Sequence, residues 1–542
     1  MPGVADYLIE RMRASGVRAI FGLPGGGGNL DLIQAAGRAG LPFVLTATET
    51  GSAIAALAQS EITDGVGACI TTLGPGAASV VNGVACAKLE RARVLVVTDS
   101  YAASGAGFEH QRLDHRALLT PIVKWSGSLA PLDSHQNIDE ALITLGSLPP
   151  GPVHLDCPAD FDDPRSGPGS AAVAGGLQPA GSLGGLKAAD YLSRAFKPLL
   201  IVGLGARRAD AAEAIRNLCE KRNIPALVTY KAKGVVPDGH PCFAGVFTNA
   251  AAERAIVEQS DLLIGVGFDP VEILPRPWSY SQPIVSLAAW EMTKAHVPFK
   301  AQAVGDIVEL VAKVSDLLPP SAWNLAAVRQ AVEAMRDAVA GYAGSSDPAS
   351  VSNGTLPLTP SRVVQLTAGH FAGASRVTVD AGAHMLPAAV LWPVNEPNGM
   401  LISNGLSTMG FALPAAIGAG LLDRMRPTVV LTGDGGLMIC LGELATAVRE
   451  RLKIVIIVFN DASLTLIELK QHARKLAPAG VGLGDVLWTR IAEGFGIPSW
   501  SAANERELIA ALGQAAAVDG PSLIEARIDR SSYTQIMKAI RG

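Results

Sequence analysis

Two acidic residues near the C-terminal end of the chain have the spacing of a metal and phosphate site. Gly433-Asp434-Gly435 follows the apolar run 428–431, and Asn460-Asp461 follows a second apolar run, 454–459. If both runs are buried parallel strands, their carboxylates lie at the edge where open α/β sheets bind ligands. Two hard oxygen ligands suit Mg²⁺ or Ca²⁺, with water and phosphate oxygens completing the coordination. Gly435-Gly436 would leave backbone amides open to an anion.

The apolar runs of the chain predict the elements that must hold this site. Short continuous apolar runs are typical of buried parallel strands, with helices as right-handed crossovers between them. They recur in three parts of the chain, which Gly-, Pro- and Ser-rich stretches at 161–187 and 341–360 separate. We predict three doubly wound parallel-sheet α/β domains, 1–165, 186–342 and 358–542. The predicted strands include 43–45, 69–71, 94–98, 199–202, 226–228, 262–264, 284–285, 377–379, 429–432, 454–459 and 523–524.

The composition excludes several classes of protein. The chain has 542 residues, a net charge of −5 and 49% hydrophobic residues, which favours packed α/β layers over disorder. It has no long basic run, so we expect neither nucleic acid nor a membrane surface as a partner. It has no apolar stretch long enough to span a membrane and no secretory signal pattern. Six scattered cysteines indicate buried thiols in a reducing compartment, so we predict a cytoplasmic location.

Glu49 is another residue whose position suggests chemistry. It lies at the junction between a predicted strand, 41–47, and a predicted helix, 51–59. On spacing alone, two interpretations stay open. Glu49 is either a carboxylate that the helix N-terminus stabilises, or a catalytic carboxyl group held apart from the metal site.

Short motifs along the whole chain are similar to those of one enzyme superfamily. They are Phe21–Gly26, Thr48-Glu49-Thr50, Gly74-Pro75-Gly76, Asn82-Gly83, Gly382-Ala383-His384, Ser407–Pro414 and the Gly433-to-Asp461 spacing. By these motifs the chain resembles the thiamine-diphosphate (ThDP) enzymes that include acetolactate synthase, pyruvate oxidase, benzoylformate decarboxylase and benzaldehyde lyase. The resemblance implies ThDP and Mg²⁺ as cofactors, or Ca²⁺ in place of Mg²⁺. It also implies a pyrimidine-binding, a middle and a diphosphate-binding domain.

The resemblance assigns cofactor-binding residues. Asp434, the side chain of Asp461 and the carbonyl of Ser463 would bind the metal ion. The family usually has Asn where this chain has Asp461, and the extra carboxylate could strengthen metal binding or repel phosphate. Alone, His384 would more often be an ordinary surface or core histidine, and Met409 an ordinary core methionine. The other predicted cofactor-binding positions are Gly26, Thr72, His384, the Ser407 carbonyl, Met409, Gly433, Gly435 and Gly436.

For Glu49, the resemblance implies the catalytic role. Its carboxyl group would hydrogen-bond to the pyrimidine ring of ThDP and promote the imino tautomer that removes the thiazolium proton, while the carbanion chemistry belongs to the cofactor. In this superfamily the cofactor spans a subunit interface, with Glu49 from one subunit and Asp434 from the other. We therefore expect a homodimer as the minimal active unit, and homotetramers are common in the family.

The reaction is predicted from the segment before Lys124. Counting back from Lys124, Gln111 falls where acetolactate synthases have an active-site Gln, and His110 falls near a polar Gln of benzaldehyde lyase. Gly26 and Thr72 replace the Ser and His that benzoylformate decarboxylase uses as acid–base groups. With few side-chain acids, a carbanion is protonated slowly and survives to attack a second carbonyl, which favours carboligation. The alternative for His110 and Gln111 is a solvated loop.

The middle third gives little evidence for a nucleotide. Val202–Ala206 follows a predicted strand and faintly resembles a dinucleotide-binding loop, but it lacks the third glycine. Acetolactate synthases and pyruvate oxidases bind FAD in this domain, yet Gly265–Pro270 departs from the Arg/Asp pattern of acetolactate synthases. We predict a noncatalytic nucleotide-like fold without FAD.

Together these features predict a ThDP- and Mg²⁺-dependent enzyme that acts on a small-molecule 2-oxo acid or aldehyde, with acetolactate-synthase-like carboligation as the preferred reaction. One alternative is a nonoxidative 2-oxo acid decarboxylase or an aldehyde lyase. An alternative from another class is a noncatalytic relative that binds the cofactor, although Glu49 and both metal-site carboxylates are retained.

Overall fold

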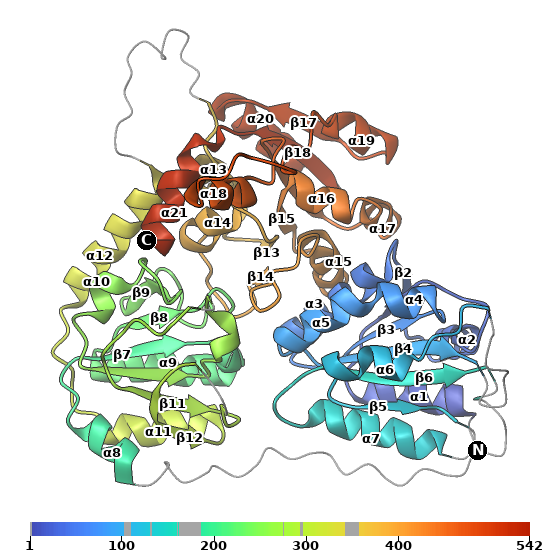
Figure 1. Cartoon of the computed structure of the whole chain (residues 1–542), viewed down its shortest axis with the longest axis horizontal. Coiled ribbons are helices and arrows are strands. Elements are labelled where there is room, and N and C mark those ends of the chain that lie inside the picture. Colours follow the sequence, from blue (N-terminus) through green and yellow to red (C-terminus); the bar gives the residue numbers. More distant parts are fainter. Residues whose placement is uncertain are drawn as a thin grey trace.

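Three six-stranded sheets organise the chain, and every strand pair in them is parallel (Figure 1). This confirms the predicted α/β class with three doubly wound sheets. The computed structural model describes residues 3–101, 110–130, 133–159, 161, 186–274, 276–292, 296–341 and 357–542.

The first sheet has the strand order β2-β1-β3-β4-β6-β5. Its central strand β3 is buried at every residue, as expected for a parallel strand covered by helices on both faces. The strands are β1 (Ile20–Gly22), β2 (Phe43–Leu45), β3 (Gly67–Thr71), β4 (Val94–Ser100), β5 (Ser126–Ser128) and β6 (Val153–Pro158). The helices are α1 (Val4–Ala14), α2 (Asn29–Arg38), α3 (Glu49–Thr63), α4 (Pro75–Ser79), α5 (Val81–Leu89), α6 (His115–Leu119), the 3-10 turn η1 (Thr120–Ile122) and α7 (Ser134–Gly146).

The second sheet has the order β12-β11-β10-β7-β8-β9 and an apolar core of its own. Its strands are β7 (Pro198–Val202), β8 (Ala226–Val228), β9 (Phe243–Val246), β10 (Leu262–Val266), β11 (Ile284–Ala288) and β12 (Phe299–Val304). The helices are α8 (Leu186–Ser193), η2 (Leu204–Ala206), α9 (Ala209–Arg222), α10 (Arg254–Val257), η3 (Pro270–Glu272), α11 (Ile307–Leu317) and α12 (Leu325–Ala340).

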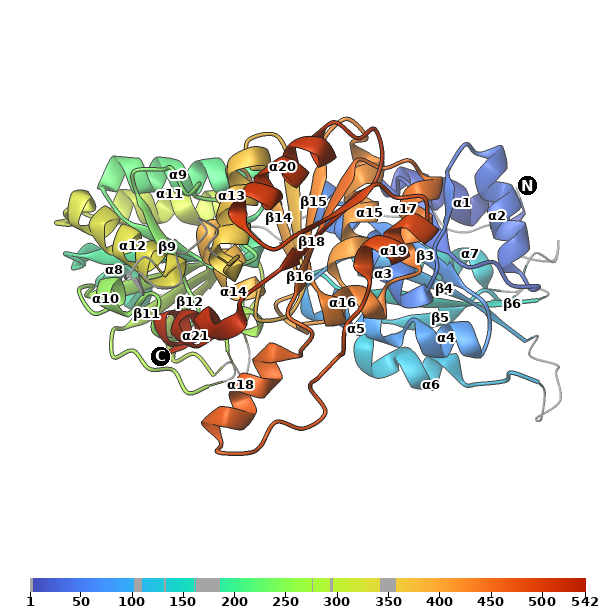
Figure 2. The same cartoon turned by 90° about the horizontal axis from the view of Figure 1, so that it is seen from above.

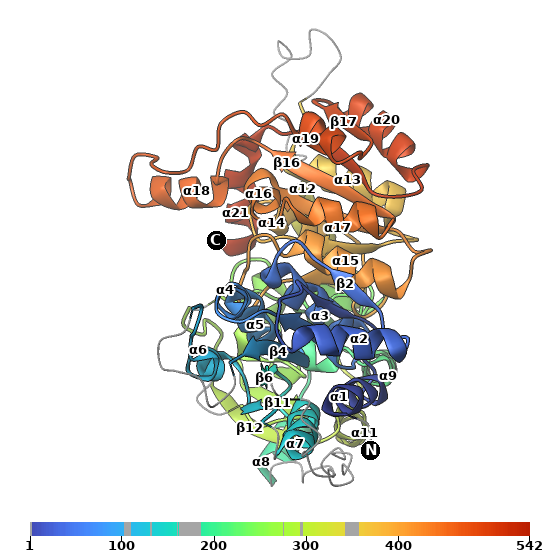
Figure 3. The ribbon, with the colours of Figure 1, turned by 90° about the vertical axis from the view of Figure 1, so that its right-hand side faces the viewer.

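The third sheet has the order β14-β13-β15-β16-β18-β17. Its strands are β13 (Arg376–Val379), β14 (Met400–Ile402), β15 (Thr428–Gly433), β16 (Ile454–Asn460), β17 (Ser499–Ala502) and β18 (Ser522–Arg527). The helices are α13 (Pro360–Phe371), α14 (Met385–Leu391), α15 (Ala412–Leu422), α16 (Asp434–Ile439), α17 (Glu443–Arg449), α18 (Thr465–Ala473), α19 (Trp488–Gly494), α20 (Glu505–Ala516), η5 (Arg530–Ser532) and α21 (Tyr533–Arg541). Helix α18 projects from the body of the molecule (Figures 2 and 3).

Every predicted strand coincides with an observed strand, although the one expected at 41–47 is shorter, at Phe43–Leu45. Most strands that were not predicted, namely β5, β9, β12, β14 and β17, lie at sheet edges. Of these, β5, β12 and β17 are partly exposed at an edge and do not require an apolar run, whereas β14 is buried and apolar but only three residues long. Strand β5, for example, is Ser126-Gly127-Ser128. The predicted linkers, 161–187 and 341–360, fall largely outside the described residues.

The first and third domains share one apolar core, in which α3 lies against α15 (Figures 2 and 3). Both helices bury small side chains along most of their length. A Cβ atom at Gly418 would lie 2.3 Å from the Ala55 carbonyl oxygen, so this close approach requires glycine. The packing of α3 on α15 therefore fixes where Glu49, the first residue of α3, lies relative to the third domain.

The middle domain also contacts the third, which lies between the other two when seen from above (Figure 2). Tyr230 and Val246 of the middle domain and Val339 of α12 belong to the apolar core of the third domain. All six cysteines are free and buried, as predicted. Among the residues that the structure describes, no helix is both long and apolar enough to cross a membrane.

Candidate cofactor and active site

Asp434 and Asp461 meet at the carboxyl edge of the third sheet, as the sequence predicts. Strands β15 and β16 are neighbours, and Gly433 pairs in register with Phe459. Asp434 is the residue after β15 and the first of α16, and Asp461 is the residue after β16. The register therefore places both carboxylates at adjacent strand ends.

The two carboxylates need a neutralising partner. Burial and the nearby charge of Asp461 raise the pKa of Asp434 to about 6, and burial raises the pKa of Asp461. The Asp434 Oδ1 atom accepts from the Gly435 amide at 2.7 Å, while its Oδ2 atom is buried without a hydrogen-bond partner among the described residues. In Asp461, Oδ1 accepts from the Ser463 amide at 3.2 Å and Oδ2 from the Thr465 hydroxyl at 2.6 Å. A divalent cation fits this pair, because it would neutralise two facing carboxylates and use the unpartnered oxygen.

His384 packs closely against the glycines beside it at this sheet edge. His384 is buried, and its ring stacks on Phe459 with centroids 5.2 Å apart. Burial lowers its pKa to about 4, so the ring is neutral at physiological pH. Its Nε2 atom is buried without a hydrogen-bond partner in the described part of the chain. A Cβ atom on Gly433 would lie 3.3 Å from this ring, so a side chain at this position would crowd His384.

Ser407 and Met409 lie on a turn that Asp380 holds in place. Asp380 accepts from the amides of Gly410 at 3.1 Å and Phe411 at 2.9 Å. The Met409 Cε atom lies 3.4 Å from the Cβ position of Gly435, which brings the turn against the predicted diphosphate loop. Ser407 has a left-handed φ of 55° and is exposed. The sequence analysis did not identify Asp380, although it follows an apolar strand in the same way as Asp434.

Glu49 lies at the corresponding edge of the first sheet. The helix begins two residues earlier than predicted, because Thr48 caps it by accepting from the Gly51 amide at 2.9 Å. Glu49 is half-buried, and a Cβ atom on Gly76 would lie 3.3 Å from its Oε1 atom. Thus the Gly74–Gly76 turn lies against the predicted catalytic carboxyl group.

Glu443 positions the start of α3 and was missed by the sequence analysis. This buried side chain accepts from the Ala47 amide at 3.2 Å, from the Thr48 amide at 3.0 Å and from the Thr48 hydroxyl at 3.1 Å. A carboxylate that binds amides from a segment almost 400 positions away has no local sequence signal. The residue follows the predicted diphosphate loop at the start of α17, so it ties the start of α3 to the third domain of the same chain.

The glycine-rich loop of the first domain encloses a further carboxyl group. Gly25 lies against Thr72, with only 2.2 Å between its Cβ position and the Thr72 hydroxyl oxygen, and Gly26 is exposed. Asp99 is buried behind this loop and accepts from the Asn29 amide at 2.6 Å. Burial raises the pKa of Asp99 to about 6. The sequence analysis did not identify Asp99, because its role arises from the loop that folds over it.

His110 and Gln111 are exposed beside the Gly74–Gly76 turn. A Cβ atom on Gly74 would lie 2.2 Å from the Gln111 carbonyl oxygen, and Gln111 has a left-handed φ of 65°. Phe108-Glu109, the beginning of the same motif, lies outside the described residues. The Gly74 amide donates to the buried His115 Nε2 atom at 3.1 Å, so His115 supports this turn from beneath.

Three family models match the chain in the order of its domains. They are the "Thiamine pyrophosphate enzyme, N-terminal TPP binding domain" at residues 3–118, the "central domain" at 186–314 and the "C-terminal TPP binding domain" at 380–526. The two models for TPP binding contain the two sheet edges described above. The chain is a thiamine pyrophosphate enzyme.

Similar curated proteins extend over nearly the whole enzyme. The acetolactate synthase isozyme 1 large subunit of Escherichia coli (strain K12) is 28% identical, over 97% of this chain and 94% of that protein. The catabolic acetolactate synthase of Raoultella terrigena is also 28% identical, over 97% and 95%. The acetolactate synthase of Bacillus subtilis (strain 168) is 27% identical, over 97% and 93%. These similarities, together with the presence of Glu49, Asp434 and Asp461, argue against the noncatalytic alternative.

We predict that Asp434→Ala removes the metal-dependent binding of ThDP. In the wild-type enzyme, ThDP with Mg²⁺ should raise the melting temperature, since a ligand at about a hundred times its Kd stabilises by roughly 2.7 kcal/mol. The variant should lose this stabilisation because the metal ion loses a ligand that bridges to the diphosphate. The measurement is thermal unfolding with and without ThDP and Mg²⁺.

The control for this prediction is Asp519→Ala, which removes an acidic side chain that is 92% exposed in the same domain. It should keep the full stabilisation. A wild-type response in the Asp434 variant would show that Asp434 is not a metal ligand.

Proposed function

We propose that the enzyme is a ThDP- and Mg²⁺-dependent carboligase that acts on 2-oxo acids, in the manner of acetolactate synthases. The similarity to acetolactate synthases over 97% of the chain carries this proposal. The site supports it, because the residues that match the family occupy the edges of two sheets. At the edge of the third sheet, Asp434 and His384 each have a buried polar atom without a hydrogen-bond partner among the described residues. We keep the cytoplasmic location as a prediction.

The proposed roles follow from the contacts of each residue. Asp434, Asp461 and the Ser463 carbonyl would hold Mg²⁺, and the neutral His384 would lie beside the diphosphate together with the glycine amides. Glu49 would hold or release a proton at its carboxyl group, on the opposite side of the cofactor. When bound, ThDP supplies the carbanion chemistry for making or breaking a bond next to a carbonyl.

A second copy of the chain would complete the site. Apolar side chains are exposed beside both halves: Met438 and Ile439 on α16 are 44% and 59% exposed, and Leu113 and Leu118 near Gln111 are 51% and 36% exposed. Such surfaces favour burial against another chain. We propose a homodimer or homotetramer in which Glu49 of one copy faces Asp434 of another.

The middle domain is proposed to lack FAD, because Glu272 occupies its glycine loop. The Glu272 Oε2 atom accepts from the Leu204 amide at 2.9 Å, and a Cβ atom on Gly203 would lie 2.6 Å from the same oxygen. Burial raises the pKa of Glu272 to about 8. An internal carboxyl group thus takes the amide that a nucleotide phosphate would use.

We therefore expect the purified enzyme to be colourless. The measurement is the visible absorbance of the native protein and of the supernatant after denaturation. Stoichiometric FAD in that supernatant would contradict the absence of a flavin.

We predict that Glu49→Gln keeps ThDP bound but slows exchange of the thiazolium C2 proton by about a hundredfold or more, the usual scale for an acid–base group. The amide can still form a hydrogen bond, but it cannot transfer the proton. Quenched deuterium exchange measures the rate, and the Kd for ThDP is the control. An unchanged rate would show that Glu49 is only a carboxylate that the helix N-terminus stabilises, without a catalytic role.

We predict that His110→Ala/Gln111→Gly lowers ligation more than decarboxylation. Glycine is the appropriate replacement for Gln111, because it adopts the positive φ without strain. Only ligation builds charge on the oxygen of an acceptor carbonyl, and these side chains are proposed to donate hydrogen bonds to it. Both products are quantified from a 2-oxo acid with and without an aldehyde acceptor.

Release of aldehyde alone in excess acceptor, with no effect of the double substitution, would favour the alternative function, a nonoxidative 2-oxo acid decarboxylase or aldehyde lyase.

A further inference from the structure

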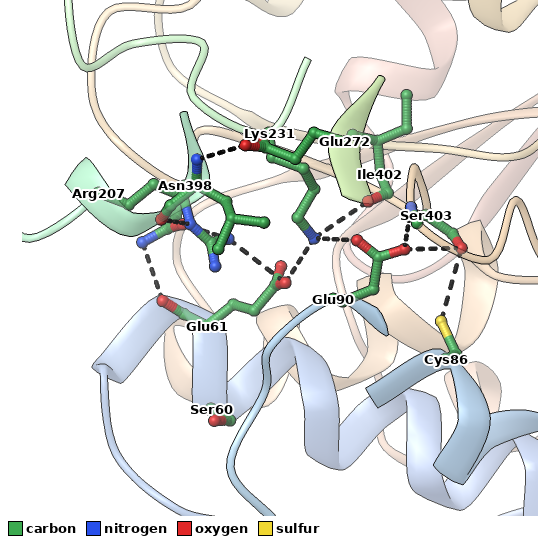
Figure 4. Close-up of polar contacts among 12 residues, drawn as sticks. Ser60, Glu61, Cys86, Glu90, Arg207, Lys231, Glu272, Asn398, Ile402 and Ser403 are labelled. Carbon is green, nitrogen blue, oxygen red and sulfur yellow. Dashed lines mark hydrogen bonds and ion pairs between the residues drawn. The ribbon is translucent and has the colours of Figure 1, made fainter. Parts of the chain in front are cut away.

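Four charged side chains, three of them buried and one mostly buried, gather where the three domains meet (Figure 4). Glu61 of α3 and Glu90 beyond α5 come from the first domain, and Lys231 and Arg207 come from the middle domain. The side chains of Lys231, Glu61 and Glu90 are each 1% exposed. The third domain contributes backbone and neutral polar groups from the segment 398–408.

Lys231 is the centre of this cluster. Its ammonium group donates to Glu61 and lies 3.1 Å from a Glu90 carboxylate oxygen. It also donates to the Ile402 carbonyl oxygen at 3.1 Å, so one side chain contacts all three domains. Burial by itself lowers the pKa of Lys231, but Glu61 and Glu90 more than reverse this, and the pKa is raised overall.

Arg207 balances the second carboxylate. It forms an ion pair with Glu61 at 3.3 Å. Burial by itself raises the pKa of Glu61, but Lys231 and Arg207 together lower it, so this carboxyl group is ionised. The cluster therefore has two cations for two carboxylates.

Glu90 transmits the position of Lys231 to the cofactor site. Its Oε1 atom accepts from the Ser403 hydroxyl at 3.1 Å and from the Gly405 amide at 2.9 Å. The Ser403 hydroxyl in turn accepts from the Thr408 amide at 3.0 Å. These bonds fix both ends of the turn that presents Ser407, whose carbonyl is the proposed acceptor for the pyrimidine amino group.

Stability alone does not explain this arrangement. Burying several charges is unfavourable, and well-packed apolar side chains of similar volume often stabilise a protein as much or more. Buried ionic groups are instead suited to fixing one geometry among several, because a misplaced charge is left unpaired. The geometry fixed here is that of the 403–408 turn relative to the first and middle domains.

We propose that Lys231 is a positioning residue for the cofactor, acting through Glu90 on the 403–408 turn. The middle domain thereby sets the affinity for ThDP without contacting it. The proposal rests on the ThDP site proposed above.

The test compares two variants that each leave one buried carboxylate facing one arginine. Lys231→Met/Glu90→Gln leaves Glu61 with Arg207. The control, Lys233→Met, removes a second buried lysine of the same segment and leaves Asp238 with Arg336. Lys233 contacts Asp238 and not the 403–408 turn in the described structure.

Two quantities are measured for each variant: the melting temperature without ligand, and the Kd for ThDP at saturating Mg²⁺ by tryptophan fluorescence. We expect the double variant to raise the Kd by about tenfold or more, the scale expected for loss of a charged hydrogen-bond acceptor. The control variant should lower the melting temperature but leave the Kd within about twofold of the wild-type value. This change is much smaller than the tenfold rise expected for the double variant.

The outcomes separate this proposal from the function on which it rests. If the wild-type enzyme binds ThDP and the double variant has the same Kd, the positioning role of Lys231 is wrong, but the cofactor site is not. No binding by the wild-type enzyme would overturn the cofactor site, and the proposal with it. If the double variant does not fold, Glu90→Gln replaces it. This variant keeps Lys231 and Glu61, and it must raise the Kd for the proposal to stand.

Discussion

Carboxylates at the edge of the third sheet are the constraint on which the proposed cofactor site depends. Asp380, Asp434 and Asp461 all follow parallel strands, so the sheet brings them to the same edge. Backbone amides satisfy Asp380, which thereby fixes the turn that carries Met409. Asp434 keeps an oxygen without a partner among the described residues, and a divalent cation fits there. Asp380, bound by amides, thus holds a turn in place, whereas Asp434 is suited to bind a cation.

The first domain is held to the third domain by close backbone contact rather than by large side chains. Helices α3 and α15 approach so closely at Gly418 that a Cβ atom would overlap the Ala55 carbonyl. Glu443 then binds the amides at the start of α3. Apolar packing sets the separation of the domains, and a directional carboxylate sets the orientation of Glu49. The cluster around Lys231 performs a similar function at the junction with the middle domain.

The sequence predicted most of the interior strands, because strands buried on both faces are continuously apolar, but it missed the interior strands β1 and β6. It also predicted that Asp434 and Asp461 would meet, because consecutive strands of a doubly wound sheet are often neighbours. It also missed five edge strands, of which β5, β12 and β17 are partly exposed and need less apolar surface. It missed Asp99 and Glu443, whose partners are backbone amides brought close only by the fold. The roles of His110 and Gln111 stay predictions, because both side chains are exposed and their proposed partner is a substrate.

The sequence by itself determined the α/β class, the family and the residue types at both sheet edges. These follow from local patterns, namely apolar runs, glycine-rich turns and acidic residues directly after strands. Only the tertiary structure decided which buried charges face one another and which are satisfied by amides. Hydrogen bonds and ion pairs depend on distances of a few ångströms between segments far apart in the chain. For this reason the partnership of Lys231 with Glu61, Glu90 and Ile402 became visible only in the fold.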